Sequence, residues 1–225
     1  MRFDCHGKDL ILRPIIIGAG RGSRLNAMTF DQPKCYVPIG GRRILDWTLQ
    51  TFNRAGIGPA VFIGGYMIER IRSDYPDLTF CHNQNWQNNN ILASLFHAED
   101  LMEEPFVCCY SDCLFTAAVI DGVIRGEGEI SLSVDVGWRE RYAERTEHPA
   151  DDAEKVTVAN GVVTRIEREI LEEEAYGEFT GVARFSVEGA ATLRRHYHRC
   201  CDRYEGGPFR GAAAFRKAYF IHLLQ

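Results

Sequence analysis

The sequence lacks an excess of positive charge, and this absence excludes two broad classes of function. Its 225 residues carry a formal net charge of −5. Nucleic acids and anionic membranes attract proteins through clustered positive charge. We therefore expect no nucleic-acid partner and no membrane partner, and any anion that the protein binds has to be held by a few local groups.

Long apolar runs, repeats and low-complexity linkers are also missing. Residues 1–10 (MRFDCHGKDL) mix charges of both signs, and the apolar run behind them is too short for a signal peptide or a spanning helix. This pattern predicts a cytoplasmic protein. Because 45% of the residues are apolar and no linker interrupts the chain, we expect a single domain over residues 1–225.

Cysteine pairs with metal-ligand spacing are absent as well. None of the eight cysteines forms a C-x-x-C pair, the spacing that is typical of zinc and redox sites. Reduced and mostly buried thiols are the expected state. The eight are Cys5, Cys35, Cys81, Cys108, Cys109, Cys113, Cys200 and Cys201.

Up to about residue 128 the sequence alternates between strand-like and helix-like segments. The β-branched run of residues 13–20 (RPIIIGAG) is typical of a buried parallel strand, and residues 44–56 carry apolar side chains at helical spacing before a glycine. Short connections between such segments favour right-handed βαβ crossovers. Further strands are expected at 59–66, 78–83 and 105–115, and further helices at 67–76 and 89–104.

The second part of the sequence has a different pattern. Residues 129–138 and 153–169 alternate like antiparallel strands, and Asn160-Gly161 favours a hairpin turn. Residues 191–206 and 215–225 are predicted helices. We expect an α/β fold with three layers (α/β/α), Rossmann-like, with a mixed, mostly parallel central sheet and a strand-rich second half.

A glycine-rich stretch, residues 18–25 (GAGRGSRL), directly follows the first expected strand. In parallel sheets ligands bind beyond the carboxyl ends of the strands. A dinucleotide-binding loop needs G-x-G-x-x-G and a P-loop needs G-x-x-x-x-G-K-[ST], but Ser23 stands where both require a glycine. The glycines would let backbone N–H groups approach phosphate oxygens, and the side chains of Arg24 and Lys34 would add two positive charges. This combination suits a triphosphate. A simple strand-to-helix turn is the alternative.

These residues belong to a longer resemblance. The signature G-x-G-x-R-L at residues 20–25, P-K at 33–34 and P-[ILV]-x-G-[KR]-x-[IL] at 38–44 resembles the start of the nucleotidyltransferase superfamily, whose members join nucleoside triphosphates to phosphorylated acceptors. The resemblance implies the GT-A-like fold of that superfamily. It implies a nucleotide-binding half over about residues 1–128 and an acceptor-binding half over about 129–225.

Further segments are similar to one branch of the superfamily. Residues 88–95 (NNNILASL), 134–156 and 177–186 resemble the phosphocholine and 2-aminoethylphosphonate cytidylyltransferases. The implied reaction is attack by an acceptor phosphate or phosphonate oxygen on the α-phosphorus of CTP, with release of pyrophosphate. The implied acceptor is a small phosphonate or phospho-alcohol, of the 2-aminoethylphosphonate, 2-hydroxyethylphosphonate or phosphocholine type.

The resemblance implies roles for individual residues. Mg²⁺ is the implied cofactor with Asp112 as its ligand, because a carboxylate at a strand end suits a hard cation. Arg24, Lys34 and Asp112 are the expected catalytic residues. The expected nucleotide-binding residues are Gly18, Ala19, Gly20, Arg21, Gly22, Ser23, Arg24, Lys34, Asn90 and Ser94. The expected acceptor-binding residues are Asp135, Trp138, Arg141, Lys155 and Glu178.

Several alternatives stay open at this point. Asn90 and Ser94 share a helix face and are expected either at the cytidine or as a helix cap and a core serine. Trp138 is expected either at the acceptor or in ordinary packing. The resemblance implies a second metal carboxylate in a segment after residues 215–225, and Asp135 is the nearest candidate within residues 1–225.

The function has two alternatives, a sugar-1-phosphate nucleotidyltransferase and a nucleotide-binding module without catalysis. The preference for CTP depends on the resemblance, because nothing in the glycine stretch reads a base. The sequence also leaves the oligomeric state open, a homodimer included.

Overall fold

The computed structural model describes residues 12–22, 29–143, 145 and 149–225. Its centre is one eight-stranded sheet with the strand order β5-β4-β1-β6-β10-β8-β9, and β7 also pairs with β10. The parallel strands are β1 (Arg13–Gly18), β4 (Val61–Gly64), β5 (Thr79–His82) and β6 (Phe106–Tyr110). The antiparallel strands are β7 (Ile130–Asp135), β8 (Lys155–Ala159), β9 (Val162–Glu167) and β10 (Gly177–Phe185).

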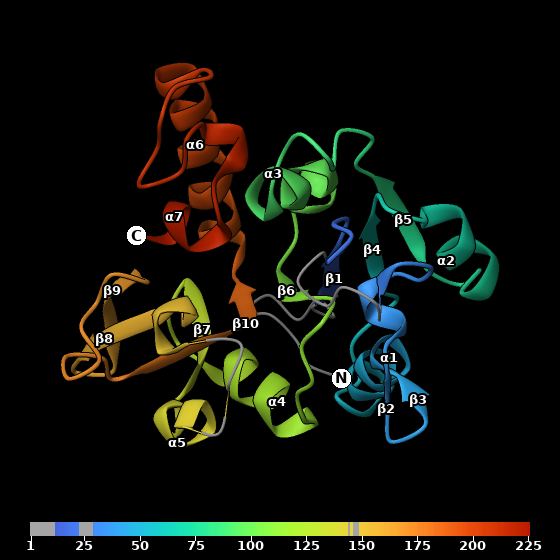
Figure 1. Ribbon diagram of the computed structural model, residues 1–225, viewed down its shortest axis with the longest axis horizontal. Helices are drawn as coiled ribbons and strands as arrows, with labels where there is room; N and C mark the ends of the chain where they lie inside the picture. Colours follow the sequence, from blue (N-terminus) through green and yellow to red (C-terminus); the bar gives the residue numbers. More distant parts are fainter. Residues whose placement is uncertain (1–11, 23–28, 144, 146–148) are drawn as a thin grey trace, which may run out of the picture.

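Helices cover both faces of the sheet, which gives the three expected layers (Figure 1). One face carries α1 (Ile44–Arg54), α2 (Ile68–Asp74) and α4 (Ala117–Arg125). The other carries α3 (Ile91–Leu95), α6 (Val187–Tyr204) and α7 (Phe220–Leu224). Shorter elements are α5 (Trp138–Ala143), the pair β2 (Pro38–Ile39) and β3 (Arg42–Arg43), and the 3-10 turns Lys34–Tyr36, Phe96–Leu101, Ala150–Asp152 and Phe215–Lys217.

The central strand β1 shows why its sequence is continuously apolar. Ile15 and Ile17 pack in the cluster under α3, α6 and α7, and Ile16 packs in the cluster under α1, α2 and α4. Successive side chains of a strand point to opposite faces, so a strand between two helical layers is apolar at every position. Burial of both faces explains the run of isoleucines.

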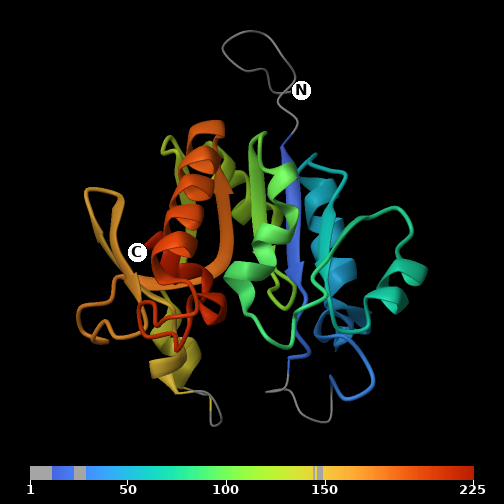
Figure 2. The ribbon, with the colours of Figure 1, turned by 90° about the horizontal axis from the view of Figure 1, so that it is seen from above.

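The strand directions bring functional loops to one edge of the sheet. β1 pairs in parallel with both β4 and β6, so the chain leaves all three strands at the same edge. In Figure 2, β1 begins near the N label and runs to the opposite edge. The glycine stretch and Asp112 follow β1 and β6 at that edge, where ligands bind in open parallel sheets.

The structure differs from the sequence predictions at two helices. The predicted helix at residues 89–104 is α3 followed by a 3-10 turn, with Ala98 outside helical geometry. The predicted helix at 215–225 begins only at Phe220, because Asn90 binds the preceding segment through the carbonyls of Arg216 and Lys217. The helix α4 had no counterpart among the predictions.

The seven described cysteines are all free, but fewer are buried than expected: Cys35, Cys108 and Cys109 are buried, and the other four are half-buried. Among the described residues, no helix combines the length and the apolar character that a bilayer crossing requires. One continuous sheet runs through both halves of the chain, from β5 to β9.

Candidate active site

The glycine stretch forms one side of a cavity of about 620 Å³ at the carboxyl edge of the sheet. Five of its predicted residues line this cavity: Gly18, Ala19, Gly20, Arg21 and Gly22. The turn is held by two hydrogen bonds, from the Tyr66 N–H to the Ala19 carbonyl (2.9 Å) and from the Thr29 hydroxyl to the Gly22 carbonyl (3.0 Å). The predicted residues Ser23 and Arg24 lie outside the described part of the chain.

Lys34 and Asp112 meet in the same cavity although they are 78 residues apart. Lys34 opens the 3-10 turn after Pro33, and Asp112 lies two residues beyond the end of β6. The Lys34 ammonium forms an ion pair with the Asp112 Oδ2, and about a quarter of each side chain is exposed (24% and 29%). The two residues therefore face the open space of the cavity, as expected for groups that contact a ligand.

The donor chemistry around Asp112 fits a hard divalent cation. The Asp112 carboxylate and the Ser111 residue both line the cavity and offer oxygen donors. No group of three or more His, Cys, Asp or Glu residues within the described ranges could hold a metal ion. A cation bound to Asp112 would thus take most of its ligands from water and from phosphate oxygens, which is the usual pattern for Mg²⁺.

The cavity wall on the α3 side contains the predicted residues Asn90 and Ser94. Asn90 caps α3: its Oδ1 accepts a hydrogen bond from the Ile91 N–H (2.9 Å), and its Nδ2 donates to the Lys217 carbonyl (3.0 Å). The Ser94 hydroxyl accepts from the buried Asn83 Nδ2 (2.9 Å) and donates to the Asn90 carbonyl. The side chains of Asn90 and Ser94 are thus hydrogen-bonded within the protein, and both residues also line the cavity.

Trp86 belongs to the same wall, and it was not among the predicted residues. Its ring meets the Tyr66 ring edge to face, with the centroids 5.5 Å apart. The sequence feature that could have identified Trp86 is the presence of an aromatic residue in the asparagine-rich loop between β5 and α3. We call Trp86, Gln87, Asn89, Asn90 and Ser94 the α3 wall.

A second part of the cavity lining contains residues that sequence reasoning missed, and three of its four residues come from the second half of the chain. It consists of Tyr110, Glu154, Arg168 and Tyr219, which we call the Arg168 wall. The Tyr110 hydroxyl donates to the Glu154 Oε2 (3.1 Å), and an Arg168 nitrogen lies 3.6 Å from the Glu154 Oε1. The Arg168 guanidinium lies over the Tyr219 ring, 4.2 Å from its centroid. The wall thus holds one cation beside one carboxylate and two aromatic rings.

The predicted residue Lys155 is next to Glu154 in the sequence but does not line this cavity. Its side chain is buried, and its ammonium donates to the Arg168 carbonyl (2.5 Å). It borders a separate hollow with Asp151, Glu169 and other residues of the same region. Neighbouring residues of an extended segment point to opposite faces, which explains why Glu154 reaches the cavity and Lys155 does not.

The other predicted acceptor residues form a second group outside the cavity lining. Asp135 and Glu178 are neighbours across β7 and β10. The Arg141 guanidinium pairs with Asp135 and holds the pKa of that carboxyl below its usual value. The Tyr142 hydroxyl donates to the Glu178 Oε1 (2.7 Å), and burial raises the pKa of Glu178.

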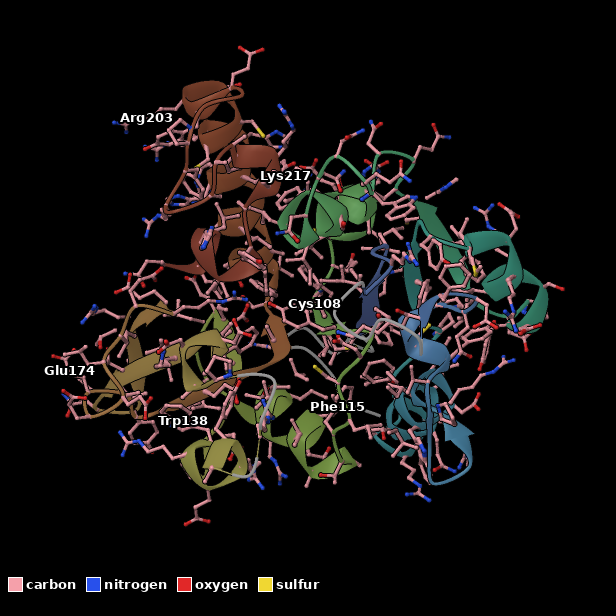
Figure 3. The ribbon with its side chains drawn as sticks, in the orientation of Figure 1. Cys108, Phe115, Trp138, Glu174, Arg203 and Lys217 are labelled. Atoms are coloured by element: carbon pink, nitrogen blue, oxygen red, sulfur yellow. The ribbon has the colours of Figure 1, made fainter. Side chains whose placement is uncertain are left out.

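Trp138 belongs to the packing of α5. It is 1% exposed and contacts a small apolar cluster that includes Ala153 and Ile170. Figure 3 shows Trp138 at α5, which it begins, and Lys217 in a separate region near α3 and α6. Of the two positions expected for Trp138, at the acceptor or in ordinary packing, the structure shows the second.

Glu154 makes the stability of the protein depend on pH near neutrality. Burial raises the pKa of its carboxyl from 4.5 to about 7. Between these values the folded state holds a proton that the unfolded state releases, so the free energy of unfolding falls as pH rises from 4.5 to 7. A shift of this size corresponds to a contribution on the order of 3 kcal/mol.

The variant Glu154→Gln, which keeps the shape but cannot ionise, is expected to lose this dependence. The measurement is urea unfolding of both proteins at pH 5 and pH 8. The stability of the wild type relative to the variant should fall between the two pH values. Equal pH slopes for the two proteins would contradict the assignment.

Gly22 is needed both for its backbone geometry and for the space beside Lys34. Its φ is +73°, and a Cβ there would lie 2.8 Å from the Lys34 Cδ. Gly56, with φ +70° and nothing within 4 Å of a Cβ, is the matched control. Gly22→Ala and Gly56→Ala should each lower stability by about 1–2 kcal/mol, the cost of a left-handed conformation.

Only Gly22→Ala should also lower turnover, by about tenfold or more, because small displacements of a catalytic group are costly. Turnover and urea unfolding are measured on both variants. A Gly56→Ala protein that lost as much activity would show that backbone strain, not the position of Lys34, sets the rate.

Comparisons with known proteins agree with this architecture. The family model described as MobA-like NTP transferase domain matches residues 14–142. The chain is 26% identical over 187 residues to a CTP:phosphoglutamine cytidylyltransferase of Campylobacter jejuni, covering 79% of this chain and 74% of that protein.

A second relative is the 2-aminoethylphosphonate cytidylyltransferase of Lancefieldella rimae, 25% identical over 99 residues, with 42% of this chain and 40% of that protein covered. Among solved structures, the CTP:phosphocholine cytidylyltransferase of Streptococcus pneumoniae superposes with a TM-score of 0.68 at 15% identity, over 95% of this chain and 83% of that one. At this identity the structural likeness shows a shared fold.

Proposed function

The chain belongs to the MobA-like NTP transferase family and is a nucleotidyltransferase, and we propose that it transfers CMP from CTP to a small phosphonate or phospho-alcohol. Pyrophosphate is the second product. The observation that carries this proposal is that one cavity joins the glycine turn, the Lys34–Asp112 pair and the Arg168 wall. Such a cavity can hold a nucleoside triphosphate and a second anion side by side.

The chemistry of the proposed reaction is mainly electrostatic. An oxygen of the acceptor attacks the α-phosphorus of CTP, and the bond from that phosphorus to the pyrophosphate oxygen breaks. Both reactants are anions, so the enzyme has to neutralise charge and align them. The Lys34 ammonium supplies one positive charge at the triphosphate, and the glycine turn lets backbone N–H groups approach its oxygens.

Asp112 is the residue that would hold Mg²⁺. The ion, when bound, would neutralise phosphate charge and orient the oxygens of the triphosphate. Asp112 itself stays a ligand and a partner of Lys34, and no proton transfer is assigned to it. The position of both side chains on the cavity lining supports this proposed division of roles.

The two walls support an assignment of the two substrates. The α3 wall offers the Trp86 ring and amide groups, which suits a nucleoside. The Arg168 wall offers a guanidinium, which suits the phosphoryl or phosphonate group of the acceptor. The carboxylates of Asp135 and Glu178, which lie outside the cavity lining, are the proposed outer end of the acceptor site. Trp138 packs nearby and is not proposed to contact the acceptor.

The choice of CTP and of a small acceptor is supported by the relatives. All three proteins named above are cytidylyltransferases, two of them named for CTP, and the acceptors in their names are phosphoglutamine, 2-aminoethylphosphonate and phosphocholine. These acceptors share a phosphate or phosphonate on a short chain with a nitrogen-containing head group. We propose an acceptor of this class.

A pyrophosphate-release screen tests the proposal. The protein is assayed with Mg²⁺, each of four nucleoside triphosphates, and phosphoglutamine, phosphocholine, 2-aminoethylphosphonate, 2-hydroxyethylphosphonate or hexose 1-phosphates. CTP with a small acceptor is the expected pair. Release with a hexose 1-phosphate alone would favour a sugar nucleotidyltransferase, and no release with any pair would favour a binding module without catalysis.

A further inference from the structure

Lys155 is a buried cation whose ammonium is hydrogen-bonded to a backbone carbonyl. It is 2% exposed, and its ammonium donates to the carbonyl of Arg168 at 2.5 Å. Arg168 is the first residue after β9, beyond the last pair of the β8–β9 ladder, Lys155 with Glu167. The Lys155 ammonium therefore binds the backbone carbonyl of Arg168, a residue that lies beyond the backbone pairing of β8 and β9.

The side chain of the same residue is held from the cavity side. The Arg168 guanidinium lies 3.6 Å from Glu154 and over the Tyr219 ring. Its Nε is buried and has no hydrogen-bond partner in the described structure. Glu154 and Lys155 are consecutive, so one short segment fixes Arg168 from both faces of the strand, the guanidinium on one face and the carbonyl on the other.

The energetics of Lys155 argue against a role in folding alone. A buried ammonium loses its hydration free energy, and one hydrogen bond to a carbonyl offsets only part of that loss. Glu178 on β10 and Glu167 on β9 are both paired with Lys155 across the strands, and the Lys155 charge lowers the pKa of Glu178 against the stronger effect of burial. An apolar side chain of similar length would fill the same space without the desolvation penalty.

From this geometry we propose that Lys155 is a positioning residue, which fixes Arg168 so that its guanidinium binds the anionic group of the acceptor. The inference rests on the proposed function, because it assumes that the Arg168 wall receives the acceptor. It differs from the role implied by the family resemblance, in which Lys155 contacts the acceptor directly. The two roles make different predictions for a double variant.

The test compares Lys155→Met, Arg168→Met and the double variant, with the best acceptor of the screen at saturating CTP. We expect Lys155→Met to raise the acceptor KM about tenfold, the size of one charged hydrogen bond. Arg168→Met should raise it about a hundredfold, the size of a lost charge-assisted ion pair. The double variant should equal Arg168→Met, and the KM for CTP should not change.

An additive double variant would mean that Lys155 contacts the acceptor itself, and would overturn the proposal. An unchanged acceptor KM in Lys155→Met would overturn it as well. Lys217→Met is the matched control, because Lys217 also donates to a backbone carbonyl, that of Gln87, and should leave the acceptor KM unchanged. Lys155→Met should unfold at the same or a higher urea concentration than the wild type, whereas a purely structural lysine would lower it.

A second readout does not depend on turnover. The Arg168 Nε–H signal in a ¹⁵N NMR spectrum is identified by its loss in Arg168→Met, and it should shift in Lys155→Met. An unchanged signal overturns the positioning role. A shifted signal in a protein that releases no pyrophosphate with any pair supports the positioning of Arg168 and rejects the proposed function, so the two failures can be told apart.

Discussion

Replacing Asp112 with asparagine is expected to abolish Mg²⁺-dependent turnover, with a loss of at least about 10³-fold, while the protein stays folded. Asp112 is the carboxylate of the cavity that lies at the end of β6, beside the Lys34 ammonium. Asparagine keeps the size and one oxygen but removes the charge that attracts a divalent cation. The measurement is pyrophosphate release over a range of Mg²⁺ concentrations.

Asp77→Asn is the control for Asp112→Asn. Asp77 is exposed and follows α2, so its replacement removes the same charge from the surface. It should leave turnover and Mg²⁺ dependence unchanged. An Asp112→Asn protein that retains more than about a tenth of the wild-type rate would remove this carboxylate from the mechanism.

Replacing Lys34 with methionine is the second large effect. We expect turnover to fall by about 10²–10³-fold, the usual cost of removing one group that stabilises developing charge. The free energy of unfolding should change by less than about 1 kcal/mol, because the Lys34–Asp112 pair is partly exposed to solvent. Turnover and urea unfolding are measured together.

Arg54→Met is the matched control for Lys34→Met, since Arg54 is an exposed cation at the end of α1. It changes the net charge by the same amount and should leave turnover unchanged. If both variants lost activity equally, the general charge of the protein, and not a cation in the cavity, would set the rate.

The architecture could be predicted from the sequence because burial leaves a direct pattern. The isoleucines of β1 and the short links between strands indicated a parallel sheet between two helical layers, and the structure has it. The helix predicted at residues 215–225 failed in its first part. A side-chain hydrogen bond from Asn90, 127 residues away, fixes that part, and no local pattern reports such a contact.

The site could be predicted where the sequence carries local geometry. The glycine turn, Lys34 and Asp112 were predicted together, and the structure brings them to one cavity. Arg168 was missed because it looks like one more charged residue at the end of a hairpin strand. Its position depends on the β8–β9 pairing and on Tyr219, some 50 residues later in the chain. Lys155 was predicted in its place because it matches a motif of the family. In the structure its side chain points away from the cavity, because neighbouring residues of a strand point to opposite faces.

The most direct test of the central claim follows the phosphorus atoms of CTP. The protein is incubated with Mg²⁺, an acceptor identified by the screen, and CTP labelled with ³²P at either the α or the γ position. A nucleotidyltransferase incorporates the α label into the acceptor product and releases the γ label as pyrophosphate. Transfer of the γ label to the acceptor, or release of the γ label as inorganic phosphate without an acceptor product, would contradict the account.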